Sequence, residues 1–307
     1  MPKKVRVVEV SLRDGLQHEK KTLSVEIRSR MAKKLVQAGV KHMELGAFVN
    51  PKWVPQMEGT TQLVEQVIKA QNRKVISSDV RFSALVPNDH GMIDAIRSGI
   101  HEVAVFTAVS KTFALKNINC TPEESLRRFE SVLKLAKKHK VKVRGYISTC
   151  FGCPYEGKIS EKKVTLLAEK LFDLGVYEVS IGDTIGVATP LQVKSLLLNL
   201  FRVASPKKYA LHFHDTRGTA VANILEGLEF GIRNFDSSLG GLGGCPFAKG
   251  AQGNVATEDI LYMIHGMGFD TGIDLQKIID TNHWLRKILG HSLPARLSRA
   301  GIPSWLR

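Results

Sequence analysis

Two patterns of apolar and polar positions alternate along the whole chain. Short runs rich in β-branched and other apolar residues are followed by longer segments whose apolar residues recur at helical spacing. The runs that predict strands are Val5–Val10, His42–Gly46, Arg81–Val86, Glu102–Phe106, Val141–Ser148, Tyr177–Gly182, Tyr209–His214 and Asn234–Ser238. The segments that predict helices are Ser24–Gln37, Thr61–Lys69, Met92–Arg97, Pro122–Lys138, Glu161–Leu174, Leu191–Val203, Thr219–Phe230 and Thr257–His265.

Glycines mark the ends of several predicted helices. Gly39, Gly99, Gly175 and Gly231 each stand between a helical segment and the apolar residue that opens the next strand. Glycine there can adopt the left-handed conformation that ends a helix. Eight strands, each followed by a helix, predict an α/β fold of the (β/α)₈ barrel type.

An open, doubly wound sheet is the alternative architecture. It would carry a glycine-rich dinucleotide-binding turn after the first strand, whereas the chain reads Ser11-Leu-Arg-Asp-Gly15 there. No linker rich in Pro, Gly or Ser divides the sequence. We therefore predict one barrel domain over residues 1–273, with residues 274–307 as a C-terminal helical extension of it.

Composition narrows the class of protein. The 307 residues are 43% hydrophobic and 24% charged, which is ordinary for a globular protein. No apolar run is long enough to span a membrane, and the N-terminus lacks a signal-peptide core. A cytoplasmic location without a membrane partner is the expectation.

The net charge of +15 raises the question of an anionic partner. The Lys and Arg residues are spread over predicted helix faces, as in Arg127-Arg128, and form no basic arm with interleaved aromatics. We expect no nucleic-acid partner. A positive field would instead favour a phosphorylated or polycarboxylate substrate.

Four cysteines are too few for a disulfide scaffold in a chain of this length. Cys150 and Cys153 form a C-x-x-C pair, but no second pair completes a structural zinc site. A redox role for this pair is a minor alternative, because the Pro-Tyr-Glu-Gly that follows is typical of a loop rather than a helix start.

His212 and His214 end the seventh predicted strand. Residues two apart on a strand point to the same face, so the two imidazoles can provide half of a metal site. Taken alone, a His-x-His pair is about as often two histidines that bind no metal as it is part of a metal site.

Other polar residues follow the predicted strands at the end where barrel enzymes place their active sites. Charged groups rarely occupy barrel strands unless they are paired or bind a metal. The residues concerned are Arg13, Asp14, Glu44, Arg144, Tyr146, Asp183 and the two histidines, followed by Asn254 beyond a glycine-rich loop.

Asp14, His212, His214 and Asn254 form a mixed nitrogen and oxygen ligand set. Such a set suits an octahedral divalent ion, and the oxygen ligands favour Mg²⁺ or Mn²⁺ over zinc. Asp14 and Asn254 also have simpler interpretations as turn formers. Cys245 lies within the loop Gly240-Gly-Leu-Gly-Gly-Cys-Pro246 and is either a reactive thiol or a small packing residue.

Several motifs resemble those of metal-dependent Claisen-type lyases and synthases with barrel folds, and most closely the 3-hydroxy-3-methylglutaryl-CoA lyase family. The resemblance extends from Val8 to about Gln276. It is carried by Ser11-Leu-Arg-Asp-Gly-Leu-Gln17, Phe48-Val-Asn-Pro-Lys-Trp-Val-Pro-Gln-Met57, Gly182-Asp-Thr-Ile-Gly186, His212-Phe-His-Asp-Thr216 and Gly241-Leu-Gly-Gly-Cys-Pro246.

The resemblance implies cleavage of 3-hydroxy-3-methylglutaryl-CoA to acetyl-CoA and acetoacetate, as in leucine degradation. It implies that Arg13 stabilises the enolate, that Cys245 acts in a loop, and that Glu9, Glu44 and Asp183 complete the polar surroundings. It also implies a homodimer. Either His212 or Asp183 is a possible base for the substrate hydroxyl.

Two positions depart from the family pattern. Leu45-Gly-Ala-Phe48 replaces a stretch that usually has small hydroxyl residues, and Arg217 stands where an aromatic residue is common. These departures keep open a related lyase or condensing enzyme that acts on another branched 3-hydroxyacyl-CoA. Basic residues that are candidates to meet the CoA phosphates are Lys20, Lys21, Lys52 and Lys111.

Overall fold

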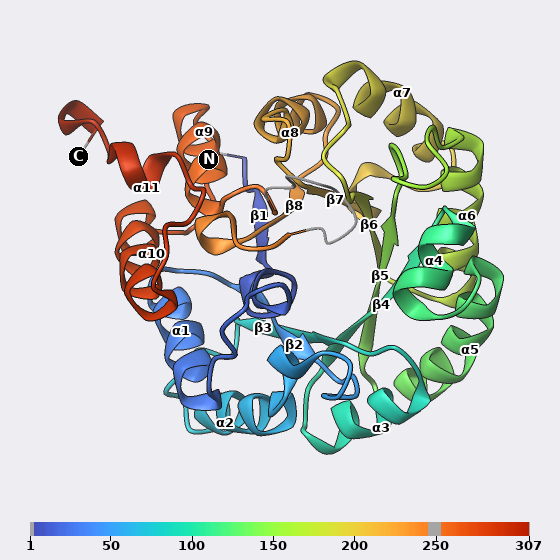
Figure 1. The fold of residues 1–307 in the computed structure, drawn as a ribbon, viewed down its shortest axis with the longest axis horizontal. Helices are drawn as coiled ribbons and strands as arrows, with labels where there is room; N and C mark the ends of the chain where they lie inside the picture. The colour runs from blue at the N-terminus through green and yellow to red at the C-terminus, as the bar shows by residue number, and fades with distance from the viewer. Residues whose placement is uncertain (1–2, 245–252, 307) are drawn as a thin grey trace.

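The computed structural model describes residues 3–244 and 253–306, and its centre is a closed barrel of parallel strands (Figure 1). Each strand pairs with its sequence neighbours, and the first pairs with the last, Arg6 lying opposite Asn234. The strands are β1 (Arg6–Glu9), β2 (His42–Ala47), β3 (Arg81–Leu85), β4 (Glu102–Ala108), β5 (Lys142–Ser148), β6 (Glu178–Asp183), β7 (Tyr209–Phe213) and β8 (Asn234–Ser237). The predicted (β/α)₈ barrel is confirmed.

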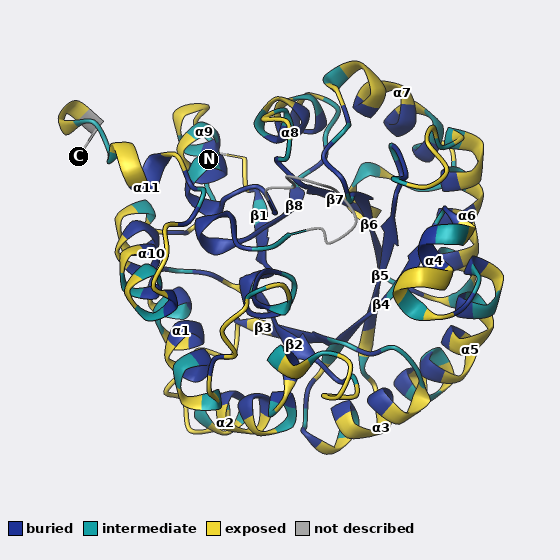
Figure 2. Ribbon diagram, in the orientation of Figure 1, coloured by how far each residue is buried: buried dark blue, intermediate teal, exposed yellow. Residues whose placement is uncertain are grey.

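Helices form a ring around the barrel and turn their buried faces towards it (Figure 2). Those at or near predicted positions are α1 (Val25–Gln37), α2 (Thr60–Asn72), α3 (Asp89–Arg97), α5 (Pro122–Lys138), α6 (Glu161–Leu174), α7 (Pro190–Leu200), α8 (Ala220–Glu229) and α9 (Thr257–Gly266). Local sequence explains individual boundaries. Thr121 and Glu124 form a reciprocal capping box at the start of α5, and Gly175 ends α6 in the left-handed conformation.

Two elements near the mouth of the barrel escaped the sequence interpretation. The helix α4 (Lys111–Ile118) begins where Ser110 Oγ accepts a hydrogen bond from Phe113 N at 3.0 Å. Its apolar pattern is weak, since only Phe113 and Ala114 are buried. The second element is a π-helical turn, η1 (Ser11–Gly15), directly after β1. Its conformation depends on neighbouring segments more than on its own residues.

The interior of the barrel is partly ionic. Arg144 of β5 donates from Nε to Glu178 Oε1 at 2.8 Å and from Nη2 to Asp236 Oδ1 at 2.7 Å. All three side chains are almost completely buried, so each charge needs its partner. This network fixes Asp236 close to the end of β7.

The C-terminal residues form α10 (Leu275–Leu289) and α11 (Leu297–Ala300), as the predicted helical extension requires. Asp274 caps α10 by accepting a hydrogen bond from Lys277 N, and α10 packs against α1 and α9 (Figure 1). Among the described residues, no helix is both long and apolar enough to cross a membrane.

Candidate active site

The turn η1 brings Arg13 and Asp14 to the carboxyl end of the barrel. A side chain at Gly15 would meet Leu242 Cβ and Ser238 Oγ, both at 2.9 Å from the added Cβ. Only glycine therefore allows η1 to pack so closely against η4 (Leu239–Gly241), which follows β8. This contact sets the position of Asp14 opposite the end of β7.

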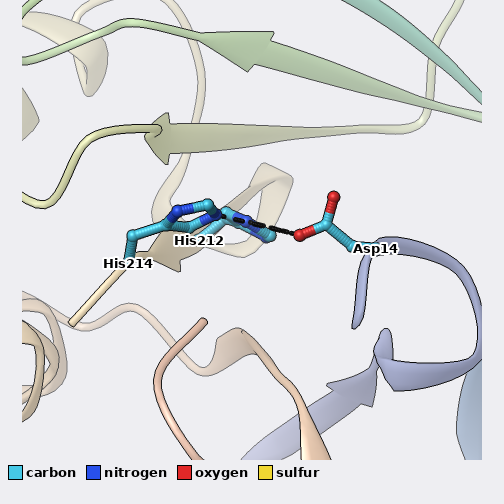
Figure 3. Close-up of side chains that lie close together, drawn as sticks. All are labelled: Asp14, His212 and His214. Carbon is cyan, nitrogen blue, oxygen red and sulfur yellow. Dashed lines mark ion pairs between the residues drawn. The ribbon is translucent and has the colours of Figure 1, made fainter. Parts of the chain in front are cut away.

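Asp14, His212 and His214 converge from two elements far apart in sequence (Figure 3). Asp14 Oδ2 lies 3.8 Å from Nε2 of His212 and 3.8 Å from Nε2 of His214. Both histidines are buried, and the possible ligand atoms all lie within 4.8 Å of one another. His214 falls one residue beyond β7, where it forms an antiparallel bridge with Asn254.

His212 is oriented by a carboxylate behind it. Its Nδ1 lies 3.3 Å from Asp236 Oδ2, so Nε2 is directed at Asp14. Burial favours the neutral form of Asp236, but Arg144 and His212 outweigh it and hold the pKa of that carboxyl well below its usual range. An ionised partner on the far nitrogen is the usual support of a metal-binding histidine.

Asn254 is the fourth residue of the cluster. Its Nδ2 donates to Asp14 Oδ2 at 2.7 Å and to the Leu242 carbonyl at 3.0 Å. The side chain thus reaches the cluster, but it presents nitrogen. A metal-binding role would require the amide to turn so that Oδ1 faces the ion.

Arg13 lies beside the cluster and is held by two carboxylates. Its Nε donates to Glu44 Oε2 at 2.8 Å, its Nη1 bonds to Asp14, and its guanidinium carbon lies 5.3 Å from the centre of the Tyr146 ring. Burial would lower the pKa of Arg13, but Glu44 and Asp14 raise it, so the side chain remains charged.

The carboxylates of this group differ in their preferred protonation states. Burial would raise the pKa of Asp14, but Arg13 and the two histidines bring it well below its ordinary value. Burial prevails over Arg13 at Glu44 and raises its pKa. Asp14 is therefore the ligand candidate that stays ionised in this arrangement.

Asp183 and Glu9 lie nearby but are engaged elsewhere. Asp183 accepts hydrogen bonds from Val187 N at 3.0 Å and Ala188 N at 2.9 Å, so both of its oxygens hold the loop after β6. Burial raises the pKa of Asp183 despite these bonds. Glu9 accepts from the Leu239 backbone N–H at 2.9 Å and so connects β1 to η4.

Three cysteines were candidates for a reactive thiol: Cys150, Cys153 and Cys245. Cys245 lies outside the described residues. Cys150 and Cys153 are buried free thiols rather than a disulfide. Cys150 Sγ donates to the Ile147 carbonyl at 3.1 Å, and burial raises the pKa of this thiol, which disfavours the reactive thiolate.

Asp236 is the important site residue that the sequence interpretation missed. It stands in the short buried strand Asn234–Ser237, between Phe235 and Ser237. A carboxylate inside such a strand must have a buried partner. This requirement is the feature of the sequence that could have identified Asp236.

The donor set fits a divalent cation. The Asp14 carboxylate oxygen lies 3.8 Å from each of the two imidazole nitrogens, longer than a hydrogen bond. Neighbouring ligands of an octahedral ion lie about 3 Å apart and opposite ligands about 4 Å apart, given metal–ligand bonds near 2.1 Å. The observed spacing falls within this range.

The fold and the site together define a TIM-barrel enzyme with a possible metal centre at the carboxyl ends of its strands. The profile of the HMGL-like family matches residues 4–285. The chain therefore belongs to the HMGL-like family, which is the family of the hydroxymethylglutaryl-CoA lyases.

Relatives from distant organisms cover nearly all of the chain. A 3-hydroxy-3-methylglutaryl-CoA lyase of Danio rerio, named as cytoplasmic, is 45% identical over 98% of this chain and 88% of its own. A 3-hydroxy-3-isohexenylglutaryl-CoA/hydroxymethylglutaryl-CoA lyase of Pseudomonas aeruginosa is also 45% identical, over 98% of both chains. The structure of an HMG-CoA lyase from Acinetobacter baumannii, in complex with coenzyme A and 3-methylmalate, superposes with a TM-score of 0.92 at 36% identity, over 99% of this chain and 97% of that one.

Proposed function

We propose that this protein is a hydroxymethylglutaryl-CoA lyase that cleaves 3-hydroxy-3-methylglutaryl-CoA to acetyl-CoA and acetoacetate. The observation that carries the proposal is the convergence of Asp14, His212 and His214 beside Arg13 at the mouth of the barrel. Lyase relatives at 42–45% identity over at least 98% of the chain support the same reaction.

Asp14, His212 and His214 would hold the divalent cation, Mg²⁺ or Mn²⁺, and Asn254 would join them after rotation of its amide. When bound, such a cation supplies Lewis-acid polarisation of the substrate oxygens. Asp236 keeps Nε2 of His212 directed at the centre through its contact with Nδ1. The mixed ligand set does not by itself select between the two metals.

Arg13 would bind the oxygen on which negative charge develops. When the C2–C3 bond breaks, C3 becomes the ketone of acetoacetate and C2 becomes the enolate carbon of acetyl-CoA. Glu44 and Asp14 fix the guanidinium, which carries five N–H donors and has others left for the substrate. A donor fixed in advance at a developing oxyanion is a large contribution to catalysis.

Two residues, His212 and Asp183, are candidates for the base that removes the C3 hydroxyl proton. His212 cannot use one nitrogen, Nε2, to ligate the ion and to take a proton at the same time. Asp183 would first have to release a backbone hydrogen bond from Val187 or Ala188. Both are candidates for the base. For the proton that C2 of acetyl-CoA takes up, the candidates are the Cys245 thiol and a water molecule.

A second candidate substrate is a 3-hydroxyacyl-CoA with a longer branch. The Pseudomonas aeruginosa relative is named for isohexenylglutaryl-CoA as well as hydroxymethylglutaryl-CoA. Gly46, one of the departures from the family pattern, has no room for a side chain, because an added Cβ would lie 2.6 Å from Thr60 Oγ1. This departure therefore reflects packing of β2 against α2 and by itself favours neither substrate.

The partner and location assignments belong to the same proposal. We propose coenzyme A thioesters as ligands, a homodimer as the assembly, and the cytoplasm as the compartment, although relatives are named both cytoplasmic and mitochondrial. Of the lysines suggested for CoA, Lys21 donates to the Ile288 carbonyl at 2.5 Å. That bond would have to open before Lys21 could meet a phosphate.

Product analysis tests the reaction. Metal-loaded protein is incubated with 3-hydroxy-3-methylglutaryl-CoA, and acetyl-CoA and acetoacetate are quantified separately. The proposal predicts equal amounts of both products. A folded, metal-loaded protein that yields neither would refute it, and preferential cleavage of 3-hydroxy-3-isohexenylglutaryl-CoA would select the second candidate.

A further inference from the structure

One arginine of the C-terminal extension contacts the segments on both sides of the proposed metal site. Arg296 Nη1 donates to Asp215 Oδ2 at 2.6 Å and lies 3.7 Å from Asp259 Oδ2. Asp215 immediately follows His214, and Asp259 lies in the first turn of α9, shortly after Asn254. The arginine thus joins the two segments that carry these ligand candidates.

The backbone of the extension makes the same connection. Arg296 N and Leu297 N donate to the two carboxylate oxygens of Asp259, at 3.0 and 2.8 Å. Both carboxylate oxygens of Asp259 therefore accept hydrogen bonds from the backbone of residues 296–297. The remaining oxygen of Asp215, Oδ1, accepts a hydrogen bond from Ala220 N at 3.0 Å and fixes the turn before α8.

The segments joined by Arg296 form the antiparallel bridge that presents the ligand candidates. His214 pairs with Asn254, Asp215 N donates to the Gly253 carbonyl, and Val255 N donates to the Phe213 carbonyl, each at 3.0 Å. A shift of Asp215 would thus move the backbone on both sides of the bridge.

His214 depends on this backbone more than His212 does. His212 has Asp236 behind its Nδ1, whereas Nδ1 of His214 is buried without a hydrogen-bond partner among the described residues. Within residues 3–244 and 253–306, no side chain stands behind Nδ1 of His214 as Asp236 does for His212. We therefore expect the orientation of His214 to be sensitive to the position of its main chain.

We infer that Arg296 is a positioning residue for the metal centre, acting through Asp215 and Asp259 on the bridge between His214 and Asn254. The inference rests on the proposed metal site and extends it to the C-terminal segment. The Arg296 side chain is 55% exposed, so its ion pairs contribute little to the free energy of unfolding. Its replacement should leave the fold intact and alter metal binding.

The test compares Arg296→Gln with Arg299→Gln, which removes the same charge from an exposed position three residues along the same segment. Mn²⁺ affinity is measured by electron paramagnetic resonance without substrate, together with the melting temperature of metal-free protein. We expect the Mn²⁺ dissociation constant to rise about tenfold in Arg296→Gln, the lower end of the range for residues behind metal ligands, and to stay at the wild-type value in Arg299→Gln. Arg296→Lys should recover part of the affinity.

Equal affinities in wild type and Arg296→Gln would overturn the inference, as would an equal loss in both glutamine variants. The binding measurement needs no turnover, so it separates this inference from the proposed reaction. Protein that binds Mn²⁺ with the predicted order of affinities, yet cleaves no substrate, would support the role of Arg296 and refute only the reaction.

Discussion

Arg13 shows how one residue can serve two partners at the site. Its guanidinium is fixed by Glu44 and Asp14 and lies against the Tyr146 ring. The two carboxylates keep it charged, and they also keep it rigid, so that it need not reorganise as charge develops on the substrate. Its effect should therefore fall on the chemical step rather than on metal binding.

Arg13→Gln is expected to lower kcat by about 10²–10³, the usual loss when one donor to a developing oxyanion is removed. Mn²⁺ affinity should persist or increase, because Asp14 loses a competing cation. Steady-state kinetics at saturating metal, with Mn²⁺ binding measured on the same samples, checks both effects. A variant with wild-type kcat would contradict the role given to Arg13.

Site residues could be predicted from the sequence where a motif places them at the end of a strand. Asp14, His212 and His214 come together as expected, because parallel strands bring their carboxyl ends to one face. Asp236 and the orientation of Asn254 were not predictable. Asp236 comes opposite His212 through the register of the neighbouring strands β7 and β8, and the Asn254 amide reaches Asp14 from 240 positions away in the sequence. Neither contact leaves a local pattern in the chain.

At the scale of elements, the glycine-rich segment after β8 shapes the site by leaving space. An added Cβ at Gly243 would lie 2.5 Å from Asn254 Nδ2, and the residue has a φ of +130°. Glycine is therefore needed both for the backbone conformation and for the amide of Asn254 to reach Asp14.

Gly243→Ala is expected to weaken Mn²⁺ binding and turnover at least tenfold, because the new methyl group displaces Asn254 from the cluster. Gly268→Ala is the matched control, since Gly268 also has a positive φ, +77°, but no atom within 4 Å of an added Cβ. Both variants bear a backbone strain of about 1–3 kcal/mol, visible in thermal unfolding. Loss of activity in both, or in neither, would contradict this account of Gly243.

Glu258 connects the same segment to the C-terminal helices. It accepts hydrogen bonds from Gly240 N, from Asn282 Nδ2 at 2.6 Å and from Ser298 Oγ at 3.1 Å. Burial raises its pKa from 4.5 to about 7. Because the folded state binds this proton more tightly than the unfolded state does, the contribution to stability is complete below about pH 4.5 and is lost as the pH rises through 7.

Glu258→Gln should therefore gain stability relative to wild type as the pH increases, by roughly 3 kcal/mol between pH 4.5 and pH 8. Denaturant unfolding at several pH values measures the difference. Glu229→Gln, at an exposed position of α8, is the control and should follow the wild-type curve. A constant difference between Glu258→Gln and wild type at all pH values would contradict the raised pKa.

At the scale of the whole molecule, the barrel fold could be predicted from the sequence. The long-range contacts that position the site could not. The alternation of apolar runs and helical segments indicated eight βα units because every strand is buried on both faces. The weakly amphipathic α4 and the π-helical η1 carry too little pattern of their own. The contacts of Arg296 with Asp215 and Asp259 join residues 37 or more positions apart and leave no local signature.

A metal bound at the proposed site should stabilise the whole fold, since its candidate ligands come from η1 and the end of β7, which meet only in the folded state. Mn²⁺ at about 100 times its dissociation constant is expected to add roughly 2.7 kcal/mol to the free energy of unfolding. Calorimetry of wild type and His214→Ala, with and without Mn²⁺, measures this gain. The variant should show little of it, and an equal gain in both proteins would place the ion elsewhere.

The central claim is that Asp14, His212 and His214 hold the cation on which cleavage depends. Its most direct test is the initial rate of acetoacetate formation from 3-hydroxy-3-methylglutaryl-CoA as Mn²⁺ is added to metal-stripped protein. We predict a rate near zero without metal, saturation in wild type, and no comparable saturation in Asp14→Asn. Full turnover by metal-free wild type, or an unchanged titration curve in Asp14→Asn, would contradict the claim.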